Sequence, residues 1–254
     1  YPDDPLAAEP PLLPTYDPGE RDLSGILELV SNTLGEPGER HPEGGVIPAR
    51  GVNTLGEVMD GPWYVNRHGR QRMTRAELVR GPGAADPPVR DGMWQALTVK
   101  PWGVRPGILM VDSDRQLYLL RFDPPGHLEM ATGAAMVASK AFHALGYHVP
   151  ENYIIYFHRD QLEVSASGEG ITSLGETRDL IPDDLDSFLA RVAVDPERGY
   201  RAVATRIPSR WGNLLGAAQV YGTRSDDPND IIPHEHRRDL RGLFVFAGWL
   251  NHSY

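Results

Sequence analysis

Cysteine is absent from the 254 residues, so the chain has no disulfide bond, no thiol nucleophile and no thiolate metal ligand. Lysine is scarce as well, since all but Lys100 and Lys140 of the 25 basic residues are arginine. The net charge of −10, without a lysine-rich tract, argues against non-specific binding of DNA or RNA. No apolar run reaches the ~18 residues of a membrane-spanning helix, so we expect no transmembrane segment.

Several motifs of catalytic sites are also missing. No Gly-x-Ser-x-Gly nucleophile elbow occurs, and Gly168-Glu169-Gly170 is interpreted as a loose turn, not as a phosphate cradle. His234 and His236 are two positions apart, which places them on opposite sides of a helix, so capping is favoured over a shared metal ion. We therefore expect no metal site and no cofactor.

Proline marks residues 1–50 as an extended N-terminal arm. One short helix is expected within it, Leu23–Leu34, because Leu23, Ile26, Leu27 and Val30 follow helical spacing. The chain begins with Tyr1 and not with Met, which favours a processed N-terminus. From this we expect an exported protein, periplasmic or extracellular.

Residues 51–92 are expected to connect the arm to the core. Within them Thr74 and Glu77 form the pattern of a capping box, which predicts a short helix over Arg75–Arg80. Gly81-Pro82-Gly83 would end that helix.

Residues 93–254 carry the alternating and helical apolar patterns of a core. The predicted strands are Trp94–Lys100, Ile108–Asp112, Gln116–Phe122, Asn152–Phe157, Leu162–Ser165 and Tyr200–Ile207, with a turn at Asp112–Arg115. The predicted helices are Glu129–Leu145, one that begins at Pro182 and includes Val192, and His236–Asn251. This order predicts an α+β fold.

Two helices have an expected buried face. For Glu129–Leu145 that face consists of Ala131, Ala134, Ala138, Ala141, Phe142 and Leu145. For His236–Asn251 it consists of Leu240, Leu243, Phe244, Ala247 and Leu250.

Several longer motifs together resemble a family of uncharacterised exported bacterial proteins with a protein-kinase-like fold. They are Tyr1-Pro2-Asp3-Asp4-Pro5-Leu6, Asn53-Thr54-Leu55-Gly56-Glu57-Val58 with Trp63 and Asn66-Arg67, Phe122-Asp123-Pro124-Pro125, Ala144–Tyr153, Asp227-Pro228-Asn229-Asp230 and Pro233–Gly242. The resemblance covers nearly the whole chain. It implies a kinase-like small lobe, an antiparallel sheet with one packed helix, followed by helices of a large lobe.

The departures from the family pattern suggest a degenerate member. Arg121 stands where the family has a phosphate-binding Lys, and Ala135 stands nearest to the expected Glu of the following helix. The family continues into a catalytic loop with an aspartate, whereas this chain ends at Tyr254, which implies an incomplete large lobe.

If a nucleotide binds, the candidate residues are Arg121, Asp123 and Glu129. The alternative is that Arg121 forms a surface ion pair with one of these two acids. No catalytic residue is assigned.

Two further groups of residues have candidate roles. Asp230 could form a structural latch with Arg237, Arg238 and Arg241, and the alternative for these arginines is a phosphate or a partner's carboxylates. Candidates for binding a partner are Leu243, Phe244, Phe246, Trp249, Trp63 and Tyr64. The last two could instead pin loops to the core.

The resulting functional hypothesis is a non-catalytic, pseudokinase-like binding or accessory subunit of a larger, possibly membrane-associated protein assembly. The first alternative is an active phosphotransferase that uses ATP and Mg²⁺. A second alternative is a secreted module that binds carbohydrate or peptide through exposed aromatic residues.

Overall fold

The computed structural model describes residues 41–61, 63–83, 87–89, 91–100, 106–171, 177–208, 220–224 and 227–250. The expected helix Leu23–Leu34 lies outside these residues. The chain divides into two compact units, each assembled from separate stretches of sequence. Unit 1 comprises residues 1–72, 145–148 and 213–254, and unit 2 comprises residues 73–144 and 149–212.

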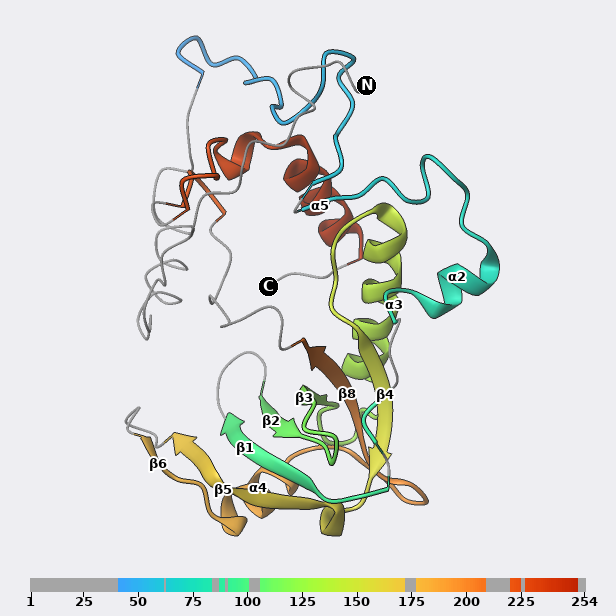
Figure 1. The fold of residues 1–254 in the computed structure, drawn as a ribbon, viewed down its shortest axis with the longest axis vertical. Coiled ribbons are helices and arrows are strands. Elements are labelled where there is room, and N and C mark those ends of the chain that lie inside the picture. The colour runs from blue at the N-terminus through green and yellow to red at the C-terminus, as the bar shows by residue number, and fades with distance from the viewer. Residues whose placement is uncertain are drawn as a thin grey trace. The chain divides into compact units, whose positions relative to one another are not determined.

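Unit 2 is built on a mixed, eight-stranded sheet (Figure 1). Its strand order is β4-β8-β3-β2-β1-β5-β6, with the short β7 paired to β8. The strands are β1 Trp94–Lys100, β2 Gly107–Val111, β3 Leu117–Phe122, β4 Asn152–Phe157, β5 Leu162–Ile171, β6 Thr177–Asp179, β7 Val194–Asp195 and β8 Gly199–Ile207. The α+β class is therefore confirmed, whereas a purely antiparallel sheet is not, because β1 and β5 run parallel.

Four α-helices and two 3₁₀ turns occur among the described residues. They are α2 Arg75–Arg80, α3 Met130–Leu145, α4 Pro182–Leu189 and α5 Arg238–Trp249, with η1 Arg159–Gln161 and η3 His234–His236. The expected bounds of β1, β4 and α2 are confirmed. No helix in the described part of the chain is long and apolar enough to span a membrane.

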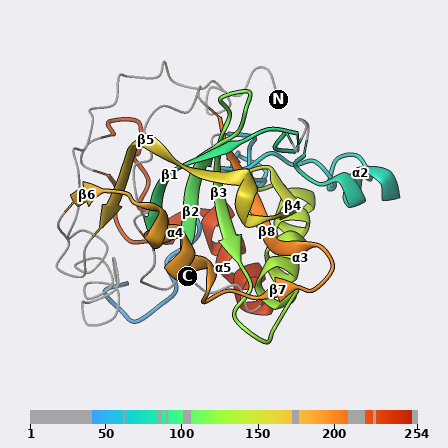
Figure 2. The same ribbon diagram turned by 90° about the horizontal axis from the view of Figure 1, so that it is seen from below.

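The two faces of the sheet differ in character. One face carries Trp94, Ile108, Leu120 and Phe157 and packs against α4, whose Leu185, Phe188 and Leu189 are buried with them. Because side chains alternate along a strand, Arg121 and Arg201 belong to the opposite face. The beginning of α3 lies on that second face (Figures 1 and 2), since Thr132 bonds to Arg201.

Two local predictions in unit 2 were wrong. Gly168–Gly170 is not a turn but part of β5, which extends to Ile171 beyond the predicted end. A Cβ at Gly168 would lie 3.2 Å from the carbonyl oxygen of Ala96 in β1, so glycine is needed there for a close approach of two strands. The helix at Pro182 ends at Leu189 and does not include Val192.

The predicted buried face of α3 was also partly wrong. The buried side chains are Thr132, Ala138, Ser139 and Phe142, whereas Ala131 and Ala134 are exposed. The helix is rotated relative to the predicted face because the Thr132 hydroxyl bonds to two buried charged groups, Asp123 and Arg201, and so points inward. Alanine is small enough to be tolerated on either face, so its spacing was a weak guide.

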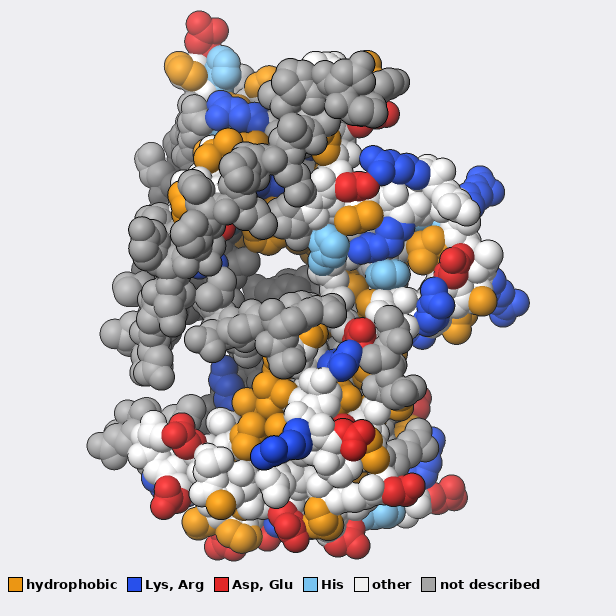
Figure 3. Space-filling view, viewed as in Figure 1, with side chains coloured by type: hydrophobic (Ala, Val, Ile, Leu, Met, Phe, Trp, Pro, Cys, Tyr) orange, Lys and Arg blue, Asp and Glu red, His pale blue; other side chains and the backbone are white. Residues whose placement is uncertain are grey.

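Exposed acids cluster on one rim of unit 2. Asp160, Asp183 and Asp186 are exposed in η1 and α4, and red side chains line this edge at the bottom of the view in Figure 3. Part of the chain's net negative charge is thus concentrated on this rim.

Among the described residues of unit 1, the regular elements are η3 and α5. Isolated bridges join Arg50 to Arg237 and Tyr64 to Tyr147. Gly146 has a φ of +113°, and a Cβ at this position would lie 2.6 Å from the carbonyl oxygen of Val65, so only glycine fits here. Backbone contacts between segments far apart in sequence thus hold the described parts of unit 1 together.

Candidate functional site

Asp123 is the central residue of the polar network on the second face of the sheet. It follows β3 directly, and only 1% of its surface is exposed. Its carboxylate accepts hydrogen bonds from the backbone N–H of Glu129 at 2.9 Å and of Thr132 at 2.8 Å, and from the Thr132 hydroxyl at 2.7 Å. Glu129 directly precedes α3 and Thr132 lies in its first turn, so Asp123 caps this helix from outside it.

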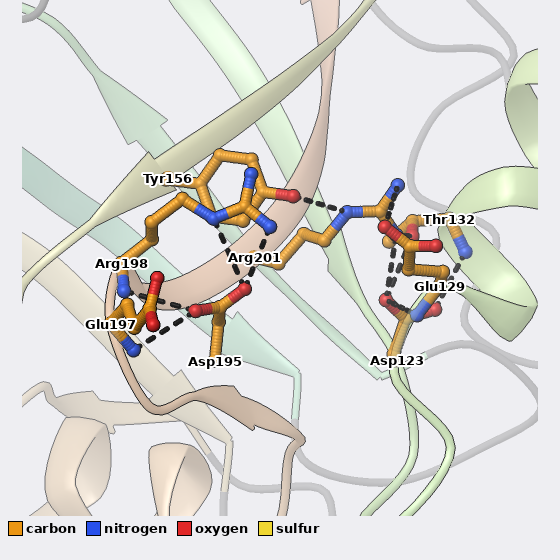
Figure 4. A network of polar contacts seen from close by, with 8 residues as sticks. All are labelled: Asp123, Glu129, Thr132, Tyr156, Asp195, Glu197, Arg198 and Arg201. Carbon is orange, nitrogen blue, oxygen red and sulfur yellow. Dashed lines mark hydrogen bonds and ion pairs between the residues drawn. The ribbon is translucent and has the colours of Figure 1, made fainter.

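Arg201 of β8 is the cation that faces Asp123 (Figure 4). Its Nη1 lies 3.2 Å from Asp123 Oδ2 and also bonds the Thr132 hydroxyl, while its Nε donates to the Tyr156 hydroxyl at 3.1 Å. The Glu129 carboxylate is 3.8 Å from Arg201 Nη2, and its side chain is 63% exposed. Three of these contacts bind the arginine firmly, and the fourth is weak.

The electrostatics favour the ionised form of Asp123. Burial by itself raises the pKa of this carboxyl, but the hydrogen bonds from Thr132, Glu129 and Arg201 outweigh burial and hold the pKa below its ordinary value. The Asp123–Arg201 pair is therefore a charged pair inside the fold at neutral pH. Oδ2 accepts three of the four hydrogen bonds and Oδ1 accepts one, so a metal ion at Oδ2 would have to displace one of these donors.

A second ion pair lies next to this network. Arg198 donates to Asp195 at 2.8 and 3.1 Å, and its guanidinium lies 4.0 Å from the centre of the Tyr156 ring. Hydrogen bonds from Arg198 and from the backbone of the tight turn lower the pKa of Asp195. Tyr156 thus connects two arginines, one through its hydroxyl and one through its ring (Figure 4).

Arg121 belongs to a different cluster. Its Nη2 donates to the Thr205 hydroxyl at 2.9 Å, and Thr205 in turn donates to the Asn152 side chain at 2.6 Å. No ion pair of Arg121 with Asp123 or Glu129 is found between these described residues. The structure brings Asp123 and Glu129 together, but it places Arg201, not Arg121, against them.

Sequence reasoning missed Arg201 and Thr132. A signal for Arg201 was present, because it interrupts a strand that is otherwise rich in small and β-branched residues, Gly199–Ile207. A charged residue in such a strand, with only 7% of its surface exposed, requires a buried partner. The identity of that partner, 78 positions away, carried no local signal.

Glu129 has an unusual backbone conformation. Its φ of +74° lies in the left-handed region, which non-glycine residues rarely adopt. This conformation aims its backbone N–H at Asp123 just before α3 begins. The strain is thus a consequence of how the helix is capped.

The latch residues of unit 1 pair differently from our expectation. Asp230 binds His234 at 2.8 Å and the backbone N–H of Arg224, whereas Arg237 pairs with Asp239 at 3.1 Å. Arg241 donates to backbone oxygens of Glu235 and Ile47. Arg238 is exposed, and its backbone N–H donates to Arg50.

Trp63 and Tyr64 serve loop packing in unit 1. The Trp63 ring stacks edge-on against His234 at 5.5 Å, and the guanidinium of Arg237 lies 5.8 Å from the centre of the Trp63 ring. Tyr64 packs against Tyr147, whose hydroxyl donates to the Asp239 carbonyl at 2.8 Å and whose pKa is raised by burial. These contacts favour the pinning role over the partner-binding role.

The four partner-binding candidates of α5 divide into two pairs. Phe244 and Trp249 are 53% and 77% exposed, whereas Leu243 and Phe246 are half-buried. The prediction that Phe244 is buried was therefore wrong. The reason is a rotated helix face, since Asp239 and Leu240 are the buried residues of α5.

Among the residues that the structure describes, no group of three His, Asp or Glu side chains could hold a metal ion. His234 and His236 are both buried; His234 bonds to Asp230, and His236 bonds to Arg241.

A scan against protein-family models finds no match, and searches of curated proteins and of solved structures return no significant similarity. Function must therefore be argued from the residues themselves.

Proposed function

We propose that this chain is a non-catalytic binding protein, an accessory subunit of a larger assembly outside the cytoplasm, built on a kinase-like core. The observation that carries the proposal is the use of Asp123. This carboxylate caps α3 and is the counter-ion of Arg201, and three of its four hydrogen bonds are accepted by Oδ2. Coordination of a magnesium ion through Oδ2 would therefore break the helix cap or the ion pair.

The position of Arg121 supports the same proposal. Phosphate capture in kinase-like sites needs a cation held by a helix carboxylate. Here Arg121 donates to the Thr205 hydroxyl, which donates in turn to Asn152, and Glu129 lies with Arg201. The residues expected to act together on a nucleotide are thus engaged in two separate structural networks.

Binding of a partner is the role we assign to the exposed side of α5. Large apolar side chains that are more than half exposed favour a protein contact, and Phe244, Val245 and Trp249 meet this description within two turns. The assembly proposed here would cover them.

The decisive experiment is a thermal-shift titration with ATP and Mg²⁺ on the full chain and on Arg121→Lys, which restores the family's lysine. We expect no saturable stabilisation of either protein. A ligand at 100 times its Kd would add about 2.7 kcal/mol of stability, which such a titration detects readily. Saturable stabilisation of the unmodified chain would overturn the proposal in favour of an ATP-dependent phosphotransferase.

A second measurement tests the accessory role. The protein is isolated from envelope and cytoplasmic fractions of its native host, as the unmodified chain, as Trp249→Asp, and as the matched control Val137→Asp. Val137 of α3 is 64% exposed, similar to Trp249. We expect one stoichiometric partner in the envelope fraction that only Trp249→Asp loses. Recovery of the chain alone from the cytoplasm would contradict the proposal.

A further inference from the structure

The exposed face of α5 is an apolar surface in unit 1. Phe244, Val245 and Trp249 are 53%, 69% and 77% exposed. Val245 and Trp249 are four positions apart and so lie on adjacent turns of one face, and Phe244 directly precedes Val245. Gly248 lies between Val245 and Trp249, and in the described part of the chain no atom comes within 4 Å of the position that its Cβ would occupy. The surface is therefore open and could admit a helix at close range.

Close to its first residue, the described part of the chain contacts α5, since residues 47–50 bond to this helix and to the residues before it. Arg241 Nη1 donates to the carbonyl of Ile47 at 2.9 Å, and Arg50 exchanges backbone hydrogen bonds with the region just before and at the start of α5. These contacts anchor residues 47–50 beside the first turn of α5. Whatever lies upstream in sequence is thus tethered within reach of this helix.

The reach of this tether is ample. Residues 35–46 separate Leu34 from Ile47, and a fully extended stretch of that length spans up to about 40 Å. The 12 residues of α5 extend over only about 18 Å. Residues 23–34 can therefore lie against any part of the helix without disturbing the anchor.

The sequence of residues 23–34 is complementary to this surface. They lie outside the part of the chain that the structure describes. Leu23, Ile26, Leu27 and Val30 form one apolar stripe at helical spacing. Acidic residues occur in and around the stripe, Glu20, Asp22, Glu28 and Glu36, against a single Arg21. The α5 segment has the opposite balance, with Arg237, Arg238 and Arg241 against Asp239.

The surface, the anchor and the charge balance point to one occupant. We infer that the apolar stripe of residues 23–34 docks, in the same chain, on the face of α5 formed by Phe244, Val245 and Trp249. Docking buries aliphatic side chains against aromatic ones and sets the acids of the arm near Arg238, which is exposed. The docked arm would then compete with the proposed partner for the same face of α5. This competition rests on the proposed function, whereas the docking itself does not.

The lack of cysteine permits a direct test. Two variants of the full chain pair Val245→Cys with one cysteine in the arm, Ile26→Cys on the stripe or Glu28→Cys. Positions 26 and 28 point ~200° apart on a helix, so they have the same tether but opposite faces. A third variant pairs Ile26→Cys with Val137→Cys on α3 and reports random collisions. A disulfide forms when the two Cα atoms approach to about 5.5 Å.

We expect the 26–245 pair to close within one molecule under mild oxidation, independently of protein concentration, because a short tether gives a millimolar effective concentration. It should also close at least about tenfold faster than the other two pairs, because docking holds position 26, and not position 28, against Val245. Equal rates for all three pairs would overturn the inference. Disulfide-linked dimers that increase with concentration would also overturn it and would identify a second copy as the occupant.

A second measurement avoids engineered cysteines. Amide hydrogen exchange of residues 240–249 is compared between the full chain and Leu27→Asp, which places a charge on the stripe. We expect faster exchange of α5 in the variant, and recovery when a peptide of residues 20–36 is added. Unchanged exchange would refute docking. Neither measurement involves a nucleotide or a partner, so failure here would leave the ATP titration to decide the proposed function separately.

Discussion

Substitution of Asp123 by asparagine tests the central network with almost no change in shape. The asparagine side chain has one oxygen and one NH₂ group, whereas the carboxylate accepts from two backbone amides, the Thr132 hydroxyl and Arg201. The NH₂ group would necessarily face at least one of these donors. Arg201, with 8% of its side chain exposed, would be left as a buried charge without its counter-ion.

The expected loss is large for a single isosteric change. Removal of one partner of a buried ion pair lowers the free energy of unfolding by about 3–5 kcal/mol. This is a substantial part of the ~5–15 kcal/mol that stabilises a typical protein. The matched control is Asp186→Asn, because Asp186 pairs with Arg159 at 2.5 Å while its side chain is 57% exposed. Such an exposed pair contributes at most about 1 kcal/mol.

Urea unfolding gives the free energies, and hydrogen exchange of α3 and β8 amides reports on unit 2 separately. The double variant Asp123→Asn/Arg201→Met should lose less than the sum of the single variants, since the charge that Asp123→Asn strands is then removed. If the two variants Asp123→Asn and Asp186→Asn lost free energy of unfolding to within about 1 kcal/mol of each other, the network would not stabilise α3 as the geometry indicates.

Four further predictions follow from the same contacts. The pKa of Asp123 is lowered in the folded state, so its ionisation stabilises the fold above the ordinary carboxyl pKa of about 4. This stabilisation is lost as the pH falls through the pKa of the folded state. The stability of α3 measured against pH should show this loss, and Asp123→Asn should make that pH dependence flatter. Glu129→Gly should raise stability by about 0.5–1 kcal/mol, because it removes a left-handed non-glycine residue whose ion pair is weak; a decrease measured in urea would show that Glu129 contributes more than its 3.8 Å contact suggests. Arg121→Gln should lower stability less than Asp123→Asn, because it removes the hydrogen bond to the Thr205 hydroxyl, worth about 1 kcal/mol, and leaves the Asp123–Arg201 pair intact; a loss near that of Asp123→Asn would contradict the separation of the two networks. Gly146→Ala should destabilise unit 1 by more than about 2 kcal/mol, because its Cβ would meet the Tyr64 ring at 2.5 Å at a positive φ, as a melting curve followed by near-UV circular dichroism can check.

Elements with local signals were predictable from the sequence. Thr74 and Glu77 predicted α2, and both hydrogen bonds of the capping box are present. Asp112 predicted the turn between β2 and β3, where its side chain accepts from the backbone of Asp114 and Gln116. These interactions join residues a few positions apart, so the sequence contains all the information that they require.

The partners of Asp123 could not be predicted in the same way. The sequence suggested Arg121, two positions away, whereas the fold supplies Arg201 from a strand 78 positions later. Strand alternation decides this outcome, since the antiparallel pairing of β3 with β8 places Arg201 level with the end of β3. Register between distant strands is set by the packing of the whole sheet.

The sequence by itself determined the longer strands and helices, and the bounds of β1, β4 and α2, because propensity, caps and turns act over a few residues; the short β6 and β7 were not predicted. Only the tertiary structure decided which face of α3 is buried, that β1 and β5 run parallel, and that Asp123 is occupied as a helix cap. These features depend on contacts between distant residues, and alanine, glycine and aspartate are compatible with several such arrangements until the sheet has formed.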